Sequence, residues 1–332
     1  MNLIIPMAGK GTRLRPQTLS TPKPLIPIAG KTILQRIVDL VSVNSNIKIN
    51  RIGFIIEKPD LSSEKILKSI AKKNGVPCDI FYQGTPRGTA HAIHCAAPLL
   101  EEEVLVVFAD TLFETKLDFS NTPDVYIFVK EVEDPRQYGV VSLNQAGEIV
   151  EFVEKPEHPT SNLAIVGMYY FKKGQLLLNE LKKVLQKKLL DKGEYQLTTA
   201  LENLRTKNIK ILPFEIDQWL DFGTPENLLQ SHSMILHQQS TQNTNTSKDY
   251  KNTIIHPPCY LAPGVVIKNS EIGPNVSIGP GSVILDSTIK NTIIQSNTTI
   301  KKATLINSII GSFVEYSPKK QSLNIGDYSK FK

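Results

Sequence analysis

The sequence predicts an α/β fold with a doubly wound, mostly parallel (Rossmann-like) sheet, followed by a short parallel β-helix. Over the first two-thirds of the 332 residues, short apolar runs rich in β-branched residues alternate with amphipathic helical patterns, which is typical of such a sheet. The first run, Leu3–Ile5, ends directly in a glycine-bearing loop. Near the C-terminus, aliphatic residues recur at every sixth position, at Ile272, Ile278 and Ile284. This period indicates a β-helix.

The first half of the chain contains four expected strands separated by three helical patterns. The strands are Leu3–Ile5, Ile52–Ile56, Ile80–Tyr82 and Val104–Phe108. One helix follows Thr32, which can cap it, and the others run from Asp60 to Asn74 and from Gly88 to Leu100. Alternation of this kind favours parallel strands, because parallel neighbours need a crossover connection that is usually a helix.

From Asp124 onward the strand patterns follow one another with short links, which predicts a substrate-binding insertion on the same sheet. The remaining expected elements are strands Val125–Val129, Val140–Leu143, Ile149–Val153, Ala164–Phe171 and Ile209–Phe214, and helices Leu176–Leu190, Leu197–Thr206 and Thr224–Gln239.

The patterns divide the chain into three expected parts. Residues 1–238 form an α/β domain, residues 239–252 form a polar linker with almost nothing to bury, and residues 253–332 form the repeat region and a C-terminal tail. The six-residue register slips after Ile284, and six residues per face would give about three coils.

Composition and charge exclude several classes of protein. The net charge is +6, but the lysines are dispersed or follow a helical face such as Lys182–Lys188, which favours a solvated surface over a nucleic-acid groove. Cys78, Cys95 and Cys259 are odd in number and lack metal-ligand spacing, so reduced thiols in a cytoplasm are expected. We see no signal peptide and no apolar run of membrane-spanning length. We therefore expect a cytoplasmic protein that binds neither nucleic acid nor a membrane.

The loop after the first strand carries residues suited to phosphate binding. Gly9 and Gly11 have no Cβ, so the backbone can approach a ligand and offer N–H groups to phosphate oxygens. Arg13 brings a fixed fork of donors, and Lys23 is a point charge between two prolines. A tight strand-to-helix turn alone would also explain the two glycines.

A second motif, residues 83–90, follows a predicted strand and opens a predicted helix. The carboxamide of Gln83 has one acceptor and one donor group, which matches the N3–H donor and O4 acceptor of uracil or thymine. Guanine presents two donors on that edge and would favour a carboxylate. A surface glutamine beside a turn is the alternative interpretation.

Two aspartates are candidate metal ligands. Asp110 follows an apolar strand at the sheet edge where ligands of open α/β sheets bind. Asp221 lies far away in sequence, shortly before a predicted helix. Mg²⁺ needs only one or two carboxylates when substrate phosphates and water supply its other ligands. Each aspartate could instead cap a helix.

Taken in order, these motifs resemble the sugar-1-phosphate nucleotidyltransferase family, which joins a sugar 1-phosphate to a nucleoside triphosphate and releases pyrophosphate. The resemblance covers about residues 1–235 through six motifs, and it is closest to the glucose-1-phosphate thymidylyltransferases. It implies that the tail is a left-handed β-helix. Lys10 departs from that subgroup, which usually has a small residue there.

The resemblance implies a role for each matching residue. It places Arg13 and Lys23 in catalysis and Mg²⁺ on Asp110 and Asp221. Nucleotide binding is implied for Ala8, Gly9, Gly11, Thr12, Gln83 and Gly88, and binding of the sugar phosphate for Gly139, Glu154, Lys155, Ile165 and Tyr169. A surface ion pair is the alternative for Glu154 and Lys155, although neighbouring strand residues point to opposite faces.

The expected reaction joins a hexose 1-phosphate, such as glucose 1-phosphate, to dTTP or UTP. Alternatives are a GDP-mannose-type guanylyltransferase, a bifunctional uridylyltransferase and acyltransferase, or a non-catalytic regulatory subunit. A dinucleotide-binding oxidoreductase is discounted because Leu14 stands where its third glycine would be. The expected role of the tail is homo-oligomerisation, through the β-helix or the catalytic domain. Its one histidine, His256, lies before the repeats.

Overall fold

A computed structural model describes residues 1–43, 47–115, 117, 119, 123–207, 209–240 and 250–318. The chain forms two compact units, one of Met1–Ile26 with Lys31–Asn227, the other of Pro27–Gly30 with Leu228–Lys332. Of the expected linker, residues 241–249 lie outside the described part, so a domain boundary at residue 238 stays a prediction. None of the helices in the described ranges has the length and apolar character that a bilayer crossing needs.

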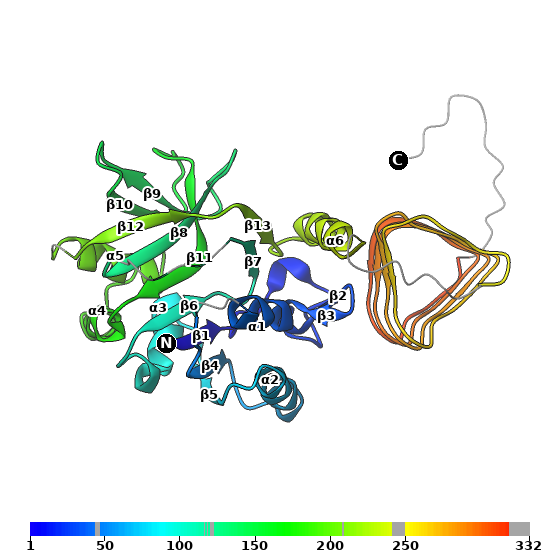
Figure 1. Ribbon diagram of the computed structural model, residues 1–332, viewed down its shortest axis with the longest axis horizontal. Helices are drawn as coiled ribbons and strands as arrows, with labels where there is room; N and C mark the ends of the chain where they lie inside the picture. The colour runs from blue at the N-terminus through cyan, green and yellow to red at the C-terminus, as the bar shows by residue number, and fades with distance from the viewer. Residues whose placement is uncertain are drawn as a thin grey trace. The chain divides into compact units, whose positions relative to one another are not determined.

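The first unit is built on a nine-stranded mixed sheet (Figure 1). Its strands are β1 (Asn2–Pro6), β4 (Arg51–Ile56), β5 (Cys78–Tyr82), β6 (Val104–Val107), β8 (Val125–Glu131), β9 (Gly139–Leu143), β10 (Ile149–Glu154), β11 (Leu163–Phe171) and β12 (Ile211–Glu215). Their main order is β10-β9-β11-β6-β1-β4-β5, while β8 pairs with both β11 and β12.

The sheet has a parallel half and a mostly antiparallel half, in which β12 is the exception because it is parallel to β8. The order β6-β1-β4-β5 is parallel throughout, as the strand–helix alternation predicts. β11 is antiparallel to β6, β8 and β9, and β10 is antiparallel to β9. The antiparallel strands correspond to the region after Asp124, where short links replace helices. Such links can only join antiparallel neighbours.

Five helices of the first unit follow the predicted patterns, but two end early: the one expected to reach Leu100, and the one expected to reach Leu190, which stops at Gln186. They are α1 (Ile33–Val43), α2 (Leu61–Lys73), α3 (Thr89–Cys95), α4 (Gly174–Gln186) and α5 (Leu197–Arg205). The Thr32 hydroxyl accepts the Gln35 N–H at 3.0 Å, so the predicted cap is confirmed. The expected helix to Leu100 is wrong at its end, because α3 stops at Cys95 and a 3₁₀ turn follows (η3, Ala97–Leu99). Pro98 has no N–H to continue an α-helix.

Four short strands were not predicted. β2 (Pro27–Ile28) and β3 (Lys31–Thr32) form one hairpin, and β7 (Thr111–Glu114) pairs antiparallel with β13 (Gln218–Asp221). Two 3₁₀ turns, η1 (Thr12–Leu14) and η2 (Lys23–Leu25), follow β1. The last helix, α6 (Pro225–Ser240), begins where the Thr224 hydroxyl accepts the Asn227 N–H at 3.2 Å.

The tail folds as a short left-handed β-helix whose three faces form a triangle (Figure 1). Its strands are β14 (Ile254–Ile255), β15 (Cys259–Leu261), β16 (Val266–Lys268), β17 (Glu271–Ile272), β18 (Val276–Ile278), β19 (Val283–Leu285), β20 (Thr288–Ile294), β21 (Thr299–Lys301), β22 (Thr304–Ile310) and β23 (Glu315–Tyr316). All pairings between them are parallel.

The β-helix has four coils instead of the expected three. Ile254 pairs with Glu271, Glu271 with Thr288, and Thr288 with Thr304, which are steps of 17, 17 and 16 residues. Three full six-residue faces would need 18 residues per coil. The shorter step explains why the six-residue register slips after Ile284. Because each coil uses fewer residues, the same segment holds one more coil. His256 also lies inside the first coil, and its Nε2 is 3.1 Å from the Glu271 carboxylate in the second.

Left-handed residues form the corners of the β-helix. Asn275, Asn291 and Asn307 repeat at equivalent corners with φ values of 61°, 42° and 51°, a conformation that asparagine tolerates better than most L-residues. The Asn291 side chain donates to the Asn307 carboxamide oxygen at 2.8 Å. The aliphatic positions between corners, such as Ile284 and Ile300, are fully buried. Polar corners and an apolar interior therefore define each coil.

The corner geometry predicts different effects for two substitutions of Asn291. Asn291→Ala should destabilise the β-helix by about 1–2 kcal/mol, because alanine is strained at positive φ and cannot bond to Asn307. Asn291→Gly also loses that bond but fits the backbone, so it should destabilise less. Thermal unfolding of both variants measures the difference, and equal midpoints would contradict it.

Candidate active site

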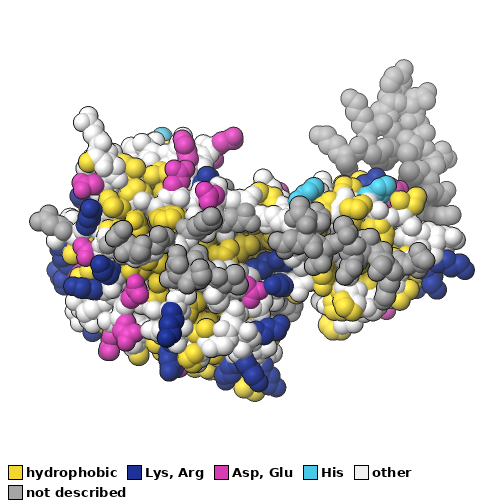
Figure 2. Space-filling view, viewed as in Figure 1, with side chains coloured by type: hydrophobic (Ala, Val, Ile, Leu, Met, Phe, Trp, Pro, Cys, Tyr) yellow, Lys and Arg dark blue, Asp and Glu magenta, His cyan; other side chains and the backbone are white. Residues whose placement is uncertain are grey.

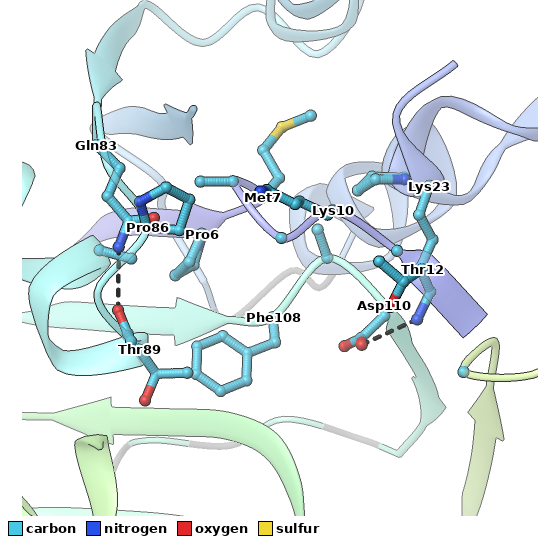
Figure 3. A pocket seen from close by; sticks show the side chains of 18 of the residues that line it. Pro6, Met7, Lys10, Thr12, Lys23, Gln83, Pro86, Thr89, Phe108 and Asp110 are labelled. Atoms are coloured by element: carbon cyan, nitrogen blue, oxygen red, sulfur yellow. Dashed lines mark hydrogen bonds and ion pairs between the residues drawn. The ribbon is translucent and has the colours of Figure 1, made fainter. Parts of the chain in front are cut away.

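A cavity of about 600 Å³ lies where β1, β5 and β6 end and their loops meet (Figure 3). The loop after β1 provides one wall, Gln83 and the start of α3 provide another, and Phe108–Asp110 after β6 provide the floor. Nine of the residues expected at the site line this cavity: Ala8, Gly9, Gly11, Thr12, Arg13, Lys23, Gln83, Gly88 and Asp110.

The two glycines of the loop have different roles. A Cβ built on Gly9 would have no heavy atom within 4 Å, and neither the backbone nor the packing requires glycine there. Gly11 has φ +58° and would place a Cβ 3.1 Å from the Thr18 side chain and 3.3 Å from Lys23 Cβ. The protein itself therefore requires glycine at position 11, whereas at position 9 the space above the backbone is open to a ligand.

Lys23 is the most buried cation of the cavity. Its residue is 8% exposed, and its ammonium lies 3.0 Å from Asp110 Oδ2 (Figure 3). A buried lysine needs a charged partner to offset desolvation. Pro22 and Pro24 flank Lys23 at the start of η2 and limit its backbone. The Lys23 side chain is therefore fixed beside the glycine loop.

The β7–β13 ribbon brings the two predicted metal ligands to the same place. Asp221 pairs with Thr111, the residue after Asp110, and the Phe222 N–H reaches the Asp110 carbonyl at 3.4 Å. The Asp221 carboxylate accepts hydrogen bonds from the Gly223 N–H at 2.9 Å, from Asn227 Nδ2 at 2.5 Å and from the Tyr138 hydroxyl at 3.3 Å.

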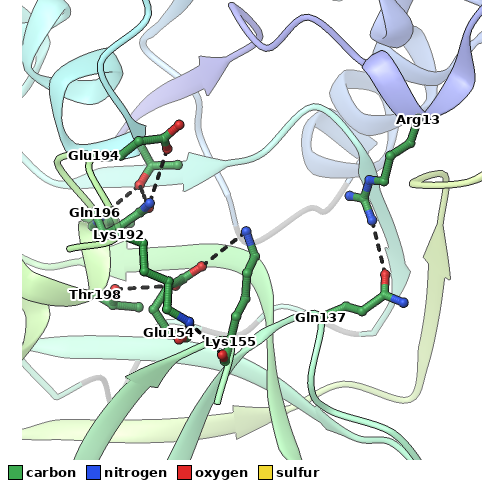
Figure 4. A network of polar contacts seen from close by, with 10 residues as sticks. Arg13, Gln137, Glu154, Lys155, Lys192, Glu194, Gln196 and Thr198 are labelled. Atoms are coloured by element: carbon green, nitrogen blue, oxygen red, sulfur yellow. Dashed lines mark hydrogen bonds and ion pairs between the residues drawn. The ribbon is translucent and has the colours of Figure 1, made fainter. Parts of the chain in front are cut away.

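Tyr138 and Arg13 complete the surroundings of Asp221. Burial, and after it the charge of Asp221, raises the pKa of Tyr138 to about 12, so the phenol remains a donor. A Cβ at Gly223 would lie 3.1 Å from both Asp221 oxygens and 3.4 Å from Arg13 Nη2. Arg13 also donates to Gln137 at 3.2 Å (Figure 4). The absence of a side chain at Gly223 thus leaves room for Arg13 beside the carboxylate.

The donor set fits a hard divalent cation. Asp110 directly precedes β7, Asp221 is the last residue of the paired β13, and the Asp110 side chain is 44% exposed and lines the cavity. In the described parts of the chain, no group of three or more His, Cys, Asp or Glu side chains forms a closed metal site. Two carboxylates suffice for a cation that takes its other ligands from phosphates and water.

The expected base-reading residues also lie together, but Gln83 is used differently from the prediction. Its Nε2 donates to the Gly88 carbonyl at 3.1 Å and lies 3.1 Å from His91 Nδ1. Burial, followed by the charge of Arg87, lowers the pKa of His91. Arg87 Nη2 can only donate and lies 2.6 Å from His91 Nε2, so Nε2 is the accepting nitrogen of the neutral ring. One amide hydrogen of Gln83 is therefore directed to the Gly88 carbonyl inside the protein, and the Gln83 oxygen remains available as an acceptor.

Gly88 has a structural reason to be glycine. Its φ is +109°, and a Cβ there would lie 2.5 Å from the Tyr195 carbonyl oxygen and 2.7 Å from the Tyr195 nitrogen. The Tyr195 backbone forms hydrogen bonds on both sides, to the Arg87 carbonyl and from the Ala90 N–H, each at 2.9 Å. The turn that begins α3 is therefore held closely against the segment that precedes α5.

The expected sugar-binding residues form a second cluster. A Cβ at Gly139 would lie 3.2 Å from Glu154 Oε2 and 3.2 Å from Ile165 Cδ1, and Thr198 Oγ1 donates to Glu154 at 3.4 Å. Burial raises the pKa of Glu154. The Tyr169 ring packs edge-on against Phe108, 5.7 Å between centroids, and Phe108 lines the cavity. Tyr169 thus connects the cluster to the nucleotide side.

Lys155 does point towards Glu154, contrary to the alternation expected along a strand. β10 ends at Glu154, and Lys155 has φ +45°. This left-handed residue turns the chain, so that the Lys155 ammonium lies 3.6 Å from Glu154 Oε1 (Figure 4). The Lys155 side chain is 55% exposed, which leaves the ammonium open to a ligand.

Sequence analysis gave no individual role to several residues of the site, although some of them lie within the motifs. The cavity is also lined by Lys10, Pro86, Thr89, Phe108 and Glu194, and Gln137 and Thr198 contact assigned residues. Most of them lie close in sequence to residues that were assigned a role. This closeness was the one feature of the sequence that could have pointed to them. On the face shown in Figure 2, Lys and Arg side chains are interspersed with acidic ones over both units, in keeping with the dispersed lysines of the sequence.

A glycine loop, a buried lysine and two aspartates brought together by paired strands lie at one edge of an α/β sheet, where ligands of such folds bind. Comparison with known proteins gives the family. The nucleotidyl transferase family matches residues 3–238, and the bacterial transferase hexapeptide family (six repeats) matches residues 252–286. The chain belongs to the nucleotidyl transferase family, and its tail carries hexapeptide repeats.

Individual proteins resemble the chain over most of its length. The bifunctional protein GlmU of Methanocaldococcus jannaschii is 32% identical over 94% of this chain and 78% of its own. A glucose-1-phosphate thymidylyltransferase of Streptomyces antibioticus is 26% identical over 99% of both. A crystal structure of a putative glucose-1-phosphate thymidylyltransferase from Bacillus anthracis, in complex with a sucrose, has a TM-score of 0.59 and 21% identity over 75% of this chain and 98% of that one, which supports the fold.

The contrast between Gly9 and Gly11 predicts that substitution of one weakens ligand binding, whereas substitution of the other lowers the stability of the fold. Gly9→Ala should unfold at the same temperature as the wild type, because the added methyl group touches no protein atom, but it should bind nucleoside triphosphate more weakly. Gly11→Ala should be less stable by about 1 kcal/mol or more, because of its positive φ and its contacts. Thermal unfolding and calorimetric titration with dTTP measure both. A Gly9→Ala variant with unchanged affinity would show that no ligand approaches position 9.

Proposed function

We propose that the protein transfers a nucleotidyl group from a pyrimidine nucleoside triphosphate, dTTP or UTP, to a hexose 1-phosphate such as glucose 1-phosphate, releasing pyrophosphate. The observation that carries the proposal is the ion pair of the buried Lys23 with Asp110, which lies in one cavity with the glycine loop and Gln83. The pair provides charge at the centre of the cavity. The loop fits phosphates, and the Gln83 end has the size and polarity for a base.

In this reaction the protein acts mainly by positioning and charge. A sugar phosphate is already mostly dianionic at pH 7, because its second pKa is about 6, so the attacking oxygen needs no general base. Glu154 contacts the hydroxyl groups of the sugar, and Lys155 binds its phosphate. Lys23, Arg13 and the loop N–H groups stabilise the negative charge that develops on the departing pyrophosphate. Attack on the α-phosphate is in line with the leaving group.

Nucleotidyltransferases of this kind generally use a divalent metal, and we propose that Asp110 and Asp221 hold Mg²⁺ here. The cation neutralises phosphate charge when it is bound. The residues around the carboxylates orient them for this role. Asn227 and Gly223 hold Asp221, and Lys23 holds Asp110.

Base selection in this proposal rests on Gln83. Its oxygen accepts the N3–H of uracil or thymine, and the Gly88 N–H in the same wall is a donor for a neighbouring base oxygen. The two donors of guanine would face the single Gln83 oxygen, which satisfies only one of them. An unpaired polar group in a buried site costs about 1–3 kcal/mol.

One assay tests the proposed function directly. Pyrophosphate release is measured across a grid of dTTP, UTP, GTP, CTP and ATP against several hexose 1-phosphates. We expect dTTP and UTP with glucose 1-phosphate to be turned over much faster than GTP with any sugar. A wild-type enzyme that prefers GTP would favour the guanylyltransferase alternative, and an inert one the regulatory subunit.

A second candidate function is a bifunctional enzyme whose β-helix also transfers acyl groups. The similarity to a relative named a bifunctional protein, and the His256–Glu271 contact within the first two coils, favour it over an inert tail. A histidine oriented by a carboxylate can act as a general base. Acyl transfer from an acyl thioester to an amino-sugar phosphate is the measurement, and an unchanged rate in His256→Ala would remove this candidate.

The metal assignment predicts the behaviour of two variants. Asp110→Asn and Asp221→Asn should each lower turnover by at least about 10²-fold, because a neutral amide binds a divalent cation poorly. Asp217→Asn, four residues before Asp221 and exposed, is the matched control and should keep wild-type turnover. Steady-state rates at saturating Mg²⁺, with circular dichroism to check folding, give the result. Near-normal turnover in either variant would exclude that residue as a ligand.

We also propose that the protein forms a homo-oligomer through the β-helix or the catalytic domain. On the fourth coil Ile306 is 55% exposed and Phe313 is 78% exposed. Such side chains favour contact with another copy. Light scattering of the full chain should show an oligomer, and the double variant Ile306→Asp with Phe313→Asp should have a lower mass with unchanged catalytic rates. An unchanged mass would place the interface on the catalytic domain.

A further inference from the structure

We propose that Lys192 is a positioning residue that holds the turn at Lys155, and so places the ammonium that binds the sugar phosphate. The inference rests on the proposed function, because it takes Lys155 as a ligand of the sugar phosphate. Lys192 lies 37 residues further along the chain, and no motif of the sequence pointed to it.

The contact itself is specific. The Lys192 ammonium donates to the Glu154 carbonyl oxygen at 3.0 Å and to the Lys155 carbonyl oxygen at 2.8 Å (Figure 4). It thus bridges the backbone of the two residues expected to bind the sugar and its phosphate. Charge-assisted hydrogen bonds of this length are stronger than neutral ones.

The turn needs such a restraint. Lys155 has φ +45°, a conformation that costs an L-residue energy and persists only where its surroundings enforce it. On one side the Lys155 N–H is held by the Tyr138 carbonyl at 3.1 Å, and on the other its carbonyl is held by Lys192. Without the turn, Lys155 would point away from Glu154 like the next residue of a strand.

Lys192 is presented by a tight turn of its own. Asp191 and Glu194 exchange backbone hydrogen bonds of 2.9 and 3.0 Å, and the two residues between them, Lys192 and Gly193, have φ values of 51° and 83°. Positive φ at both central positions is typical of a type I′ turn. The base of the Lys192 side chain is therefore fixed.

The segment that follows this turn is fastened to the nucleotide wall of the cavity. Gln196 accepts from the Thr89 hydroxyl at 3.2 Å and donates to Glu194 at 3.2 Å. The Tyr195 backbone is bonded to residues 87 and 90 at 2.9 Å each. The residues from 191 to 196 thus connect the base-reading turn at Gly88 with the sugar-phosphate turn at Lys155. Lys192 is the point of contact at the sugar end.

The test compares Lys192→Met, which removes the donors but keeps the apolar stem, with Lys192→Arg, which keeps donors. We expect Lys192→Met to raise the KM for the sugar 1-phosphate about five- to tenfold, with kcat lowered less than about twofold. Calorimetric affinity for dTTP alone should stay at the wild-type value. Lys192→Arg should restore most of the KM. Lys188→Met, an exposed lysine four residues earlier, is the charge-matched control and should match the wild type.

Each outcome has a definite meaning. An unchanged KM in Lys192→Met would overturn the positioning role. A fall in kcat and in dTTP affinity together would also overturn it, because it would indicate a general loss of structure. A wild-type protein that turns over no sugar 1-phosphate in the substrate grid would instead refute the proposed function, which separates the two failures.

Discussion

The pairing of β7 with β13 is the constraint on which the rest of the site depends. It joins two segments that are more than a hundred residues apart, and it places Asp221 opposite Thr111, beside Asp110. Lys23 is then paired through Asp110, and Tyr138, Asn227 and Arg13 gather around Asp221. Without this ribbon the two carboxylates would belong to separate loops.

Sequence patterns predicted the parts of the fold that depend on local periodicity. The parallel strands and the cap of α1 were found because apolar runs and capping residues are local signals. The β7–β13 ribbon was missed because each strand has only four residues, too few for a period. Pro98 determines where α3 ends, and the short links between strands determine the antiparallel pairings. A search for hydrophobic periodicity detects neither of these effects.

The candidate site shows the same division between local and non-local information. The glycine loop, Gln83, Asp110 and Asp221 were identified by motif, and the first three line one cavity. The hydrogen bond from the Gln83 amide to the Gly88 carbonyl and the contact with His91 could not be foreseen, because both depend on the rotamer that packing imposes. The turn at Lys155 was hidden for a similar reason. Lysine gives no signal of positive φ, and the residue that holds the turn lies on a different segment of the chain.

The corners of the β-helix have a consequence for how such chains can vary in length. Each coil pairs only with the coil above and the coil below, and its left-handed corner residues repeat in register with theirs. Duplication of one 16- or 17-residue segment would therefore add a complete coil whose interior and corners match its neighbours, without altering the α/β unit. Loss of a segment of the same length would be equally well tolerated. Evolution can thus lengthen or shorten the β-helix by whole coils while the sheet of the α/β unit stays unchanged.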